Sequence, residues 1–171
     1  MHNRNACRAA LTDEAIRFQH AHGAPAHRLS PDGYQLDSFH MRRPEAQEIQ
    51  LDLILSYRSN VALYPAFQNY FREHRPPLLA VWGKHDVFFI PPGAQAFKRD
   101  LPDAEINFLD AGHFAAETHY VEIARLNIFG ECLDLQAAGL LHDAIEPEDV
   151  VDDIVSRYER LWHEVTYEQQ V

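Results

Sequence analysis

Two residues in the middle of the chain have side chains that could do acid–base chemistry together. Asp86 ends the sequence Gly-Lys-His-Asp directly after an apolar run, and His113 ends Asp-Ala-Gly-His directly after a second apolar segment. A carboxylate that accepts a hydrogen bond from one imidazole nitrogen fixes the tautomer of the ring. The other nitrogen is then free to take a proton from a nucleophile or from water. The two residues therefore predict a general base and its orienting acid.

The segments that precede these residues have the patterns of β-strands. Leu78–Trp82 is a short continuous apolar run, typical of a strand buried on both faces, and residues 104–109 alternate between apolar and polar side chains. Between them we expect a loop at residues 91–93 and a short helix over 94–100. Such short connections imply a right-handed parallel crossover, which places both strand ends at the edge of the sheet where ligands gather.

The rest of the chain is predicted to be mainly helical, which gives an α/β fold with two parallel strands, surrounding helices and a helical C-terminal tail. Thr12 and Gly23 have the residue types that start and stop a helix, so one helix is expected over residues 11–22. The prolines and lack of periodicity in residues 24–44 predict an irregular excursion. The remaining expected helices are two over residues 45–72, joined near Tyr64-Pro65, and three over residues 118–130, 133–142 and 147–165.

Composition restricts the classes of function. With 46% hydrophobic residues the 171-residue chain can form a real core, and a net charge of -11 argues against binding to nucleic acid or to an anionic membrane. Residues 131–171 hold eleven acidic and two basic side chains, so they form a compositionally separate acidic extension. Two cysteines, Cys7 and Cys132, cannot build a disulfide framework, and no apolar run has the length of a membrane span or of a signal peptide core. A cytoplasmic location is expected.

Residues 76–119, which contain the Gly-Lys-His-Asp and Gly-His-Phe motifs, resemble the carboxyl-terminal half of an α/β-hydrolase. The resemblance is to the branch that includes epoxide hydrolases and haloalkane dehalogenases, and residues 52–71 are similar to the helical cap of that group. It implies a partial hydrolase domain over residues 1–130, with cap-like helices at 11–72 and a strand–helix–strand core at 76–124, which the acidic extension 131–171 follows without sharing the resemblance. It also implies that Asp86 is the acid and His113 the base of a catalytic triad. The implied substrate is a small ester, epoxide or halide, with no cofactor.

The third member of such a triad has no counterpart in this sequence. Those enzymes carry the nucleophile on a sharp strand-to-helix elbow, often Gly-x-Ser-x-Gly, in the preceding half of the domain. The serines at positions 30, 38, 56, 59 and 156 all lack the flanking glycines. Since loss of the nucleophile lowers the rate of a triad enzyme by orders of magnitude, we expect a truncated hydrolase that is weak or inactive by itself.

Three further expectations concern the surroundings of this pair. Aromatic side chains could line an acyl or alkyl pocket, with packing in the core as the alternative; they are Tyr57, Tyr64, Phe88, Phe89 and Phe114. Scattered histidines such as His20, His22 and His40 are expected to be solvated. Two strands cannot cover their own edges, so we expect either association with a second copy through an exposed sheet edge or marginal stability. A separate partner that supplies the nucleophile half is the alternative.

Two alternatives from other functional classes remain open. Residues 120–126 and 135–146 resemble the opening half of an HD-type metal phosphohydrolase. That resemblance implies His119, His142 and Asp143 as ligands of a divalent metal that activates water, with Glu146 as a neighbouring acid. The other alternative is a binding or assembly module without catalysis.

Overall fold

The structure is a computed structural model that describes residues 4–127, 146, 148–150, 152–154 and 156–157. The chain divides into two compact units, Met1–Thr118 and His119–Val171. In chain order, the elements are α1 (Arg4–Arg8), a 3-10 helix (Ala9–Leu11), α2 (Asp13–Ala21), α3 (Pro31–Met41), α4 (Ala46–Ser56), α5 (Arg58–His74), β1 (Leu79–Gly83), α6 (Pro91–Gln95), a second 3-10 helix (Ala96–Arg99), β2 (Glu105–Leu109) and α7 (Ala115–Thr118).

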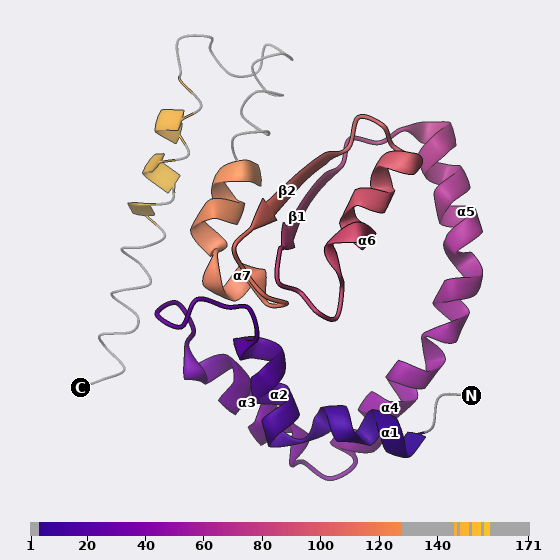
Figure 1. Ribbon diagram of the computed structural model, residues 1–171, viewed down its shortest axis with the longest axis vertical. Helices are drawn as coiled ribbons and strands as arrows, with labels where there is room; N and C mark the ends of the chain where they lie inside the picture. The colour runs from indigo at the N-terminus through magenta and orange to yellow at the C-terminus, as the bar shows by residue number, and fades with distance from the viewer. Residues whose placement is uncertain (1–3, 128–145, 147, 151, 155, 158–171) are drawn as a thin grey trace. The chain divides into compact units, whose positions relative to one another are not determined.

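The first unit confirms the predicted fold class, because it is mostly helical and contains a two-stranded parallel sheet. β1 and β2 lie side by side with Leu79 opposite Glu105 and Gly83 opposite Leu109 (Figure 1). The prediction that the first strand is buried on both faces was wrong. Most side chains of β1 and β2 are only half-buried, since no further strand extends the sheet within the described part of the chain.

The connection between the strands differs from the prediction at its start. Residues 91–93 are not a loop, because α6 begins at Pro91 and runs on into the 3-10 helix. Proline suits the first turn of a helix, where its missing N–H would have no partner and its fixed φ is already helical. Pro91 and Pro92 therefore form the first turn of α6 and do not belong to a loop before it.

The prediction of an irregular excursion over residues 24–44 was also wrong, because α3 fills much of it. The Ser30 hydroxyl accepts a hydrogen bond from the backbone N–H of Asp32, and Pro31 occupies the first turn. Asp32 places a negative charge at the positive end of the helix dipole. These start signals outweigh the cost of about 1 kcal/mol for glycine inside a helix, here Gly33. The neighbouring α2 agrees with the prediction, with the Thr12 hydroxyl accepting from Ala15 N–H.

Two helices cover residues 45–72 as predicted, but their junction lies at Tyr57 and not at Tyr64-Pro65. Pro65 is in the interior of the 17-residue helix α5. An interior proline removes one backbone hydrogen bond and crowds the preceding turn, but the other turns of a long helix persist on either side. The prediction placed the helix boundary wrongly because it took Pro65 as the end of a helix.

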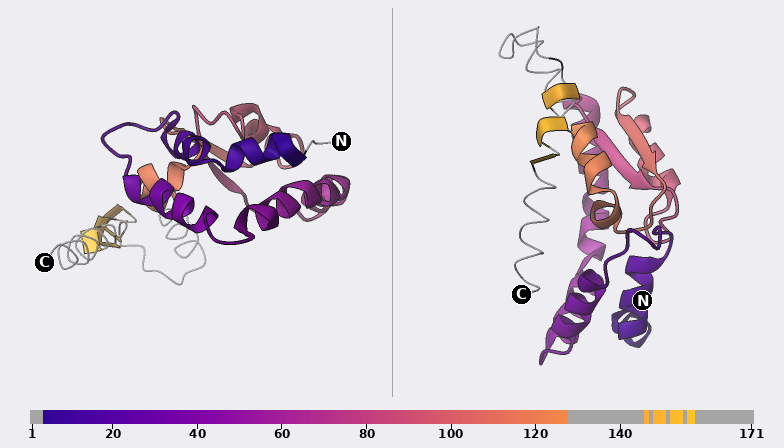
Figure 2. Two further views of the ribbon diagram at one scale, coloured as in Figure 1. Left: turned by 90° about the horizontal axis from the view of Figure 1, so that it is seen from below. Right: turned by 90° about the vertical axis from the view of Figure 1, so that its left-hand side faces the viewer.

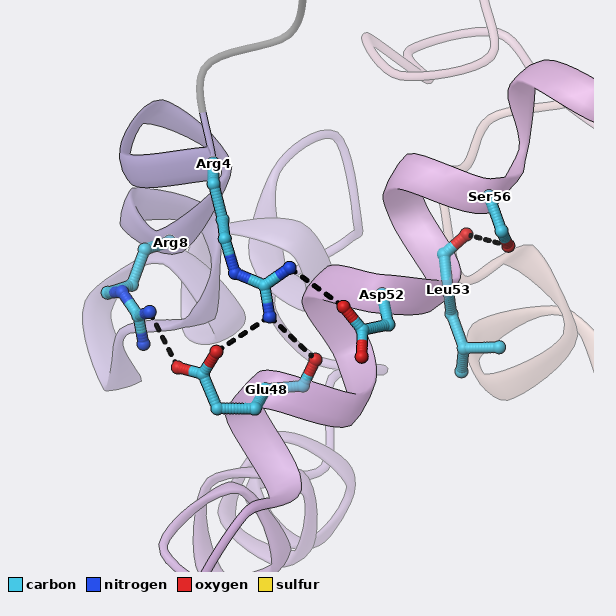
Figure 3. A network of polar contacts seen from close by, with 6 residues as sticks. All are labelled: Arg4, Arg8, Glu48, Asp52, Leu53 and Ser56. Atoms are coloured by element: carbon cyan, nitrogen blue, oxygen red, sulfur yellow. Dashed lines mark hydrogen bonds and ion pairs between the residues drawn. The ribbon is translucent and has the colours of Figure 1, made fainter.

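Helix α1 was not predicted, and it packs on α4 through charged side chains (Figures 1 and 2). Arg4 Nη1 lies 2.7 Å from Asp52 Oδ1, while Arg4 Nη2 and Arg8 Nη2 each lie 2.6 Å from an oxygen of Glu48. Figure 3 shows this network, in which Glu48 accepts from both arginines. The five-residue helix α1 is thus tied to the chain about 40 residues downstream.

The buried core of the described residues is small. Leu51 on α4 is the largest side chain that is fully buried, and most of the other buried apolar residues are alanines. Many large apolar side chains of α4 and α5 are instead exposed to solvent. They are Ile49, Leu53, Ile54, Val61, Leu63, Tyr64, Phe67 and Tyr70.

The second unit is helical where the structure describes it. Residues 120–127 are helical, as are the described positions between 148 and 157. Arg125 Nη2 lies 2.9 Å from Asp152 Oδ1, and Arg157 Nη2 lies 2.7 Å from Asp153 Oδ2. The helix predicted over 133–142 falls outside the described residues. None of the helices that the structure describes combines the length and apolar character needed to cross a bilayer.

Candidate active site

The ends of β1 and β2 are held together beyond the strands themselves. Lys84 N–H donates to the Leu109 carbonyl at 2.9 Å, and His85 N–H donates to the Ala111 carbonyl at 3.0 Å. The backbone pairing therefore continues to within one residue of Asp86 and two residues of His113. This continued pairing places the loops that carry Asp86 and His113 side by side at the carboxyl edge of the sheet, as the sequence predicts.

Glycine allows these two loops to approach so closely. A Cβ atom at Gly83 would lie 2.2 Å from the Gly112 carbonyl oxygen and 2.6 Å from that of Ala111. Such distances are far below van der Waals contact, so any larger residue at position 83 would push the loops apart. The glycine in Gly-Lys-His-Asp thus sets the spacing between the acid and the base.

Asp86 and His113 are directly hydrogen-bonded. Asp86 Oδ2 lies 2.9 Å from His113 Nδ1, and Asp86 is only 7% exposed. Its other oxygen, Oδ1, accepts the backbone N–H groups of Phe88 and Phe89 at 2.8 and 2.9 Å. Both carboxylate oxygens therefore have partners, which offsets the cost of burying the charge. The predicted proximity of the two side chains is confirmed.

The surroundings of Asp86 keep it ionised. Burial raises the pKa of this carboxyl, but the hydrogen bonds from His113 and from the Phe89 and Phe88 N–H groups together outweigh burial, so the pKa lies below its ordinary value. Because an ionised carboxylate can only accept, His113 Nδ1 must carry the hydrogen. In the neutral imidazole, Nε2 then has the free lone pair and can accept a proton.

Three of the five predicted aromatic residues surround the His113 ring. The ring centroids of Phe88 and Phe89 each lie 5.1 Å from that of His113, and the Phe114 centroid lies 5.0 Å away. Phe88 and Phe89 are exposed, so they are not core residues of this chain, while Phe114 is half-buried. The edge of the base is therefore lined by apolar rings that are open to solvent.

The other two predicted aromatic residues do not join this cluster. Tyr57 and Tyr64 hydrogen-bond to each other through their hydroxyl groups at the α4–α5 junction, and both are exposed. The bond from Tyr57 raises the pKa of Tyr64 above its ordinary value. Neither tyrosine ring contacts His113 within the described part of the chain, so the structure gives them no place beside the base.

Sequence analysis missed a second histidine–acid pair at the same edge. His85 Nε2 lies 2.7 Å from Asp110 Oδ1, and both side chains are largely exposed. The signal was present in the sequence, since each residue lies within two positions of the end of one of the two paired strands. The difference from Asp86 and His113 is burial, which the sequence does not show for single residues.

His20 was expected to be solvated, and this was wrong. It is 2% exposed, and its two ring nitrogens lie near Asp37 Oδ2 and Glu117 Oε2. The two acids that contact it are 17 and 97 residues away in the chain. No local pattern around position 20 could have indicated these partners.

The serines have structural roles where the structure describes their contacts. Ser30 begins α3, while the hydroxyls of Ser56 and Ser59 donate to backbone carbonyls one turn earlier. Ser38 is buried in α3, and Ser156 lies in a helical stretch. None of the five follows a β-strand in the described part of the chain, so none occupies a strand-to-helix elbow.

The candidate metal ligands lie partly beyond the described residues. His119 is buried, but His142 and Asp143 fall outside them, so the phosphohydrolase alternative stays a prediction. Among the side chains that the structure does describe, no group of three or more His, Cys, Asp or Glu residues is arranged to hold a metal ion.

A comparison with curated proteins relates the chain to a hydrolase. It is 39% identical over 125 residues to a Saccharomyces cerevisiae protein called "Uncharacterized hydrolase YNR064C". The chain is homologous to a hydrolase. The match includes 71% of this chain but only 43% of the yeast protein, so the chain spans less than half the length of that relative. No protein-family model matches the chain, and no solved structure matches it.

Proposed function

We propose that this chain carries the acid and the base of an α/β-hydrolase active site, within a partial hydrolase domain at residues 1–130 followed by the acidic extension 131–171. The observation that carries the proposal is the hydrogen bond of 2.9 Å between Asp86 Oδ2 and His113 Nδ1, with Asp86 buried and ionised. The homology to a yeast hydrolase supports the same reaction class.

The chemistry follows from the tautomer of His113. Nε2 accepts the proton of a hydroxyl or of water while that oxygen forms a bond to an electrophilic carbon of the substrate. The ring then becomes an imidazolium, whose Nδ1–H still faces the Asp86 carboxylate. This charge pair stabilises the protonated base, which returns its proton to the leaving group in the next step.

Small esters, epoxides and alkyl halides are the proposed substrate class. Each presents an electrophilic carbon next to a compact apolar group, and the Phe88, Phe89 and Phe114 rings offer an apolar surface beside the base. Because Ser30, Ser56 and Ser59 make structural hydrogen bonds and none of the five serines follows a β-strand in the described residues, hydrolysis by the chain alone is expected to be weak, with water as the attacking group.

A substrate panel of esters, epoxides and alkyl halides tests the proposal. The purified chain is compared with the Asp86→Ala/His113→Ala double variant, and His85→Ala is the matched control, because it removes the exposed histidine of the neighbouring pair. We expect hydrolysis above background in the parent chain and in His85→Ala, and background rates in the double variant. Equal rates in all three proteins would contradict a catalytic role for the pair.

Self-association is the second proposal that the sheet supports. In the described part of the chain the sheet has two strands and no further strand pairs with its outer edges, so pairing with a second copy would satisfy the backbone N–H and C=O groups there. Sedimentation velocity over a hundredfold range of concentration tests this proposal. We expect the sedimentation coefficient to rise with concentration, whereas a constant monomeric value would contradict it.

A further inference from the structure

His20 is a buried histidine that three helices hold in place. It lies on α2, with its Nε2 atom 3.1 Å from Asp37 Oδ2 on α3 and its Nδ1 atom 3.2 Å from Glu117 Oε2 on α7. The ring of Tyr34 approaches edge-on at 6.2 Å. The imidazole is 2% exposed, while both carboxylates remain partly open to solvent.

Each ring nitrogen of His20 faces a carboxylate oxygen. A neutral imidazole can donate through only one of its nitrogens, so a carboxylate beside the other nitrogen would face a lone pair. One ring nitrogen therefore donates its hydrogen to a carboxylate, and the other nitrogen lies beside the second carboxylate, so His20 links α2 to both α3 and α7.

His20 is connected to His113 through one aromatic ring. The His20 ring stacks on Phe114 with the centroids 4.0 Å apart and an interplanar angle of 12°. Phe114 in turn meets His113 nearly edge-on, at 5.0 Å and 80°. The three rings form a continuous packed row that ends at the proposed base.

The segment that carries His113 depends on such tertiary contacts. Helix α7 has four residues before the bend at His119, too few to form a stable helix without contacts to other elements. Glu117 ties it to His20, and Arg28 Nη1 donates to the Thr118 carbonyl at 3.2 Å. The end of α2 also touches the loop before the helix, where a Cβ atom at Gly112 would lie 2.0 Å from the carbonyl oxygen of His22.

We propose that His20 is a positioning residue for His113. Held between Asp37 and Glu117, it anchors α7 and stacks on the ring of Phe114, and these contacts fix the orientation of the His113 ring toward Asp86. The inference rests on the proposed function in one respect, because His113 matters as a base only if the chain belongs to a hydrolase site.

Imidazole NMR of the whole chain tests the inference without any need for enzymatic activity. The signal to follow is the Nδ1–H of His113, whose exchange with solvent reports how firmly it is bonded to Asp86. In the Asp37→Asn/Glu117→Gln double variant both carboxylates become amides of nearly the same shape, and we expect this exchange to become about tenfold faster. His20→Gln removes the ring itself and is expected to have at least the same effect.

The control is His27→Gln, which changes an exposed histidine shortly after the same helix and should leave the exchange unchanged. If His20→Gln fails to fold, the double variant decides, because its changes lie at partly exposed side chains. Exchange within twofold of the parent chain in the double variant would overturn the positioning role while leaving the hydrolase proposal intact. Absence of a bonded Nδ1–H in the parent chain would overturn both.

Discussion

Two regions of the molecule differ in how completely their side chains find partners within the chain. They are the sheet edge at Asp86 and His113, and the helices α4 and α5. At the sheet edge, a buried carboxylate has a partner for each oxygen. On α4 and α5, large apolar side chains such as Leu53 and Phe67 remain in solvent, and charged residues carry the contacts to α1.

This difference shows that the polar contacts at the sheet edge are complete within the chain, whereas the apolar packing of α4 and α5 is not. Hydrogen bonds and ion pairs need only a few well-placed atoms, which two short strands and their loops supply. Burial of apolar side chains needs extended surfaces on both sides, and the described residues provide few of them around α4 and α5. The acid–base pair can therefore be fully formed in a chain whose helices keep apolar faces exposed.

The largest effect is expected from Leu51→Ala. Leu51 is fully buried on α4, so its truncation leaves a cavity and should lower the free energy of unfolding by about 3 kcal/mol. Leu53→Ala, on the same helix, is the matched control, and because Leu53 is 59% exposed we expect a change below about 0.5 kcal/mol. Chemical denaturation measures both. Similar losses for the two variants would contradict the contrast between the buried and exposed sides of α4.

Asp86→Asn is expected to have the next largest effect, about 2 kcal/mol of unfolding free energy at neutral pH, because it replaces a charge-assisted hydrogen bond to His113 by a neutral one. The amide oxygen can still accept from Phe88 and Phe89, which limits the loss. Denaturation of the parent chain and the variant at the same pH measures the difference. No loss of stability would show that the sheet edge does not depend on the charge.

The pH dependence of that difference has a defined sign. The pKa of Asp86 in the folded chain lies below its ordinary value of 3.8, so the ionised carboxylate stabilises the fold above that value, and the contribution is lost as the pH falls through the folded-state pKa. The parent chain should therefore lose its advantage over Asp86→Asn in acid, below the ordinary value. An advantage that grows on acidification would contradict the lowered pKa.

Ser30→Ala should cost about 1 kcal/mol, because it removes the hydroxyl that caps α3 at the Asp32 N–H. This change tests whether the capping residues start the helix that carries Asp37. Ser59→Ala is a suitable control, since that hydroxyl bonds to a carbonyl within an exposed helical turn. Thermal unfolding followed by circular dichroism compares the two, and equal stability would remove the capping argument.

The smallest effect is expected from Arg4→Ala. Its ion pairs with Glu48 and Asp52 are solvent-exposed, so water and salt screen them, and the denaturation midpoint should shift little (Figure 3). Repeating the measurement in high salt should abolish any remaining difference from the parent chain. A loss as large as that of Asp86→Asn would show that the α1–α4 contact stabilises the fold as much as the sheet edge does.

The sequence was most informative where local patterns are strong. Apolar runs located both strands to within one residue, and the residues directly after them predicted the acid–base pair. It was least informative where a residue type has two uses. Pro65 was interpreted as a break but lies inside α5, while Pro31 and Pro91 were interpreted as loop residues but begin helices.

The sequence by itself determined the parallel strand–helix–strand unit and the meeting of Asp86 with His113, because side-chain periodicity and the geometry of a short crossover leave few other arrangements. Only the tertiary structure decided the burial of His20 between Asp37 and Glu117, the exposed second pair of His85 and Asp110, and the separation of Tyr57 and Tyr64 from the base. Burial and long-range partners depend on how distant helices pack, and no local pattern of residues encodes that packing.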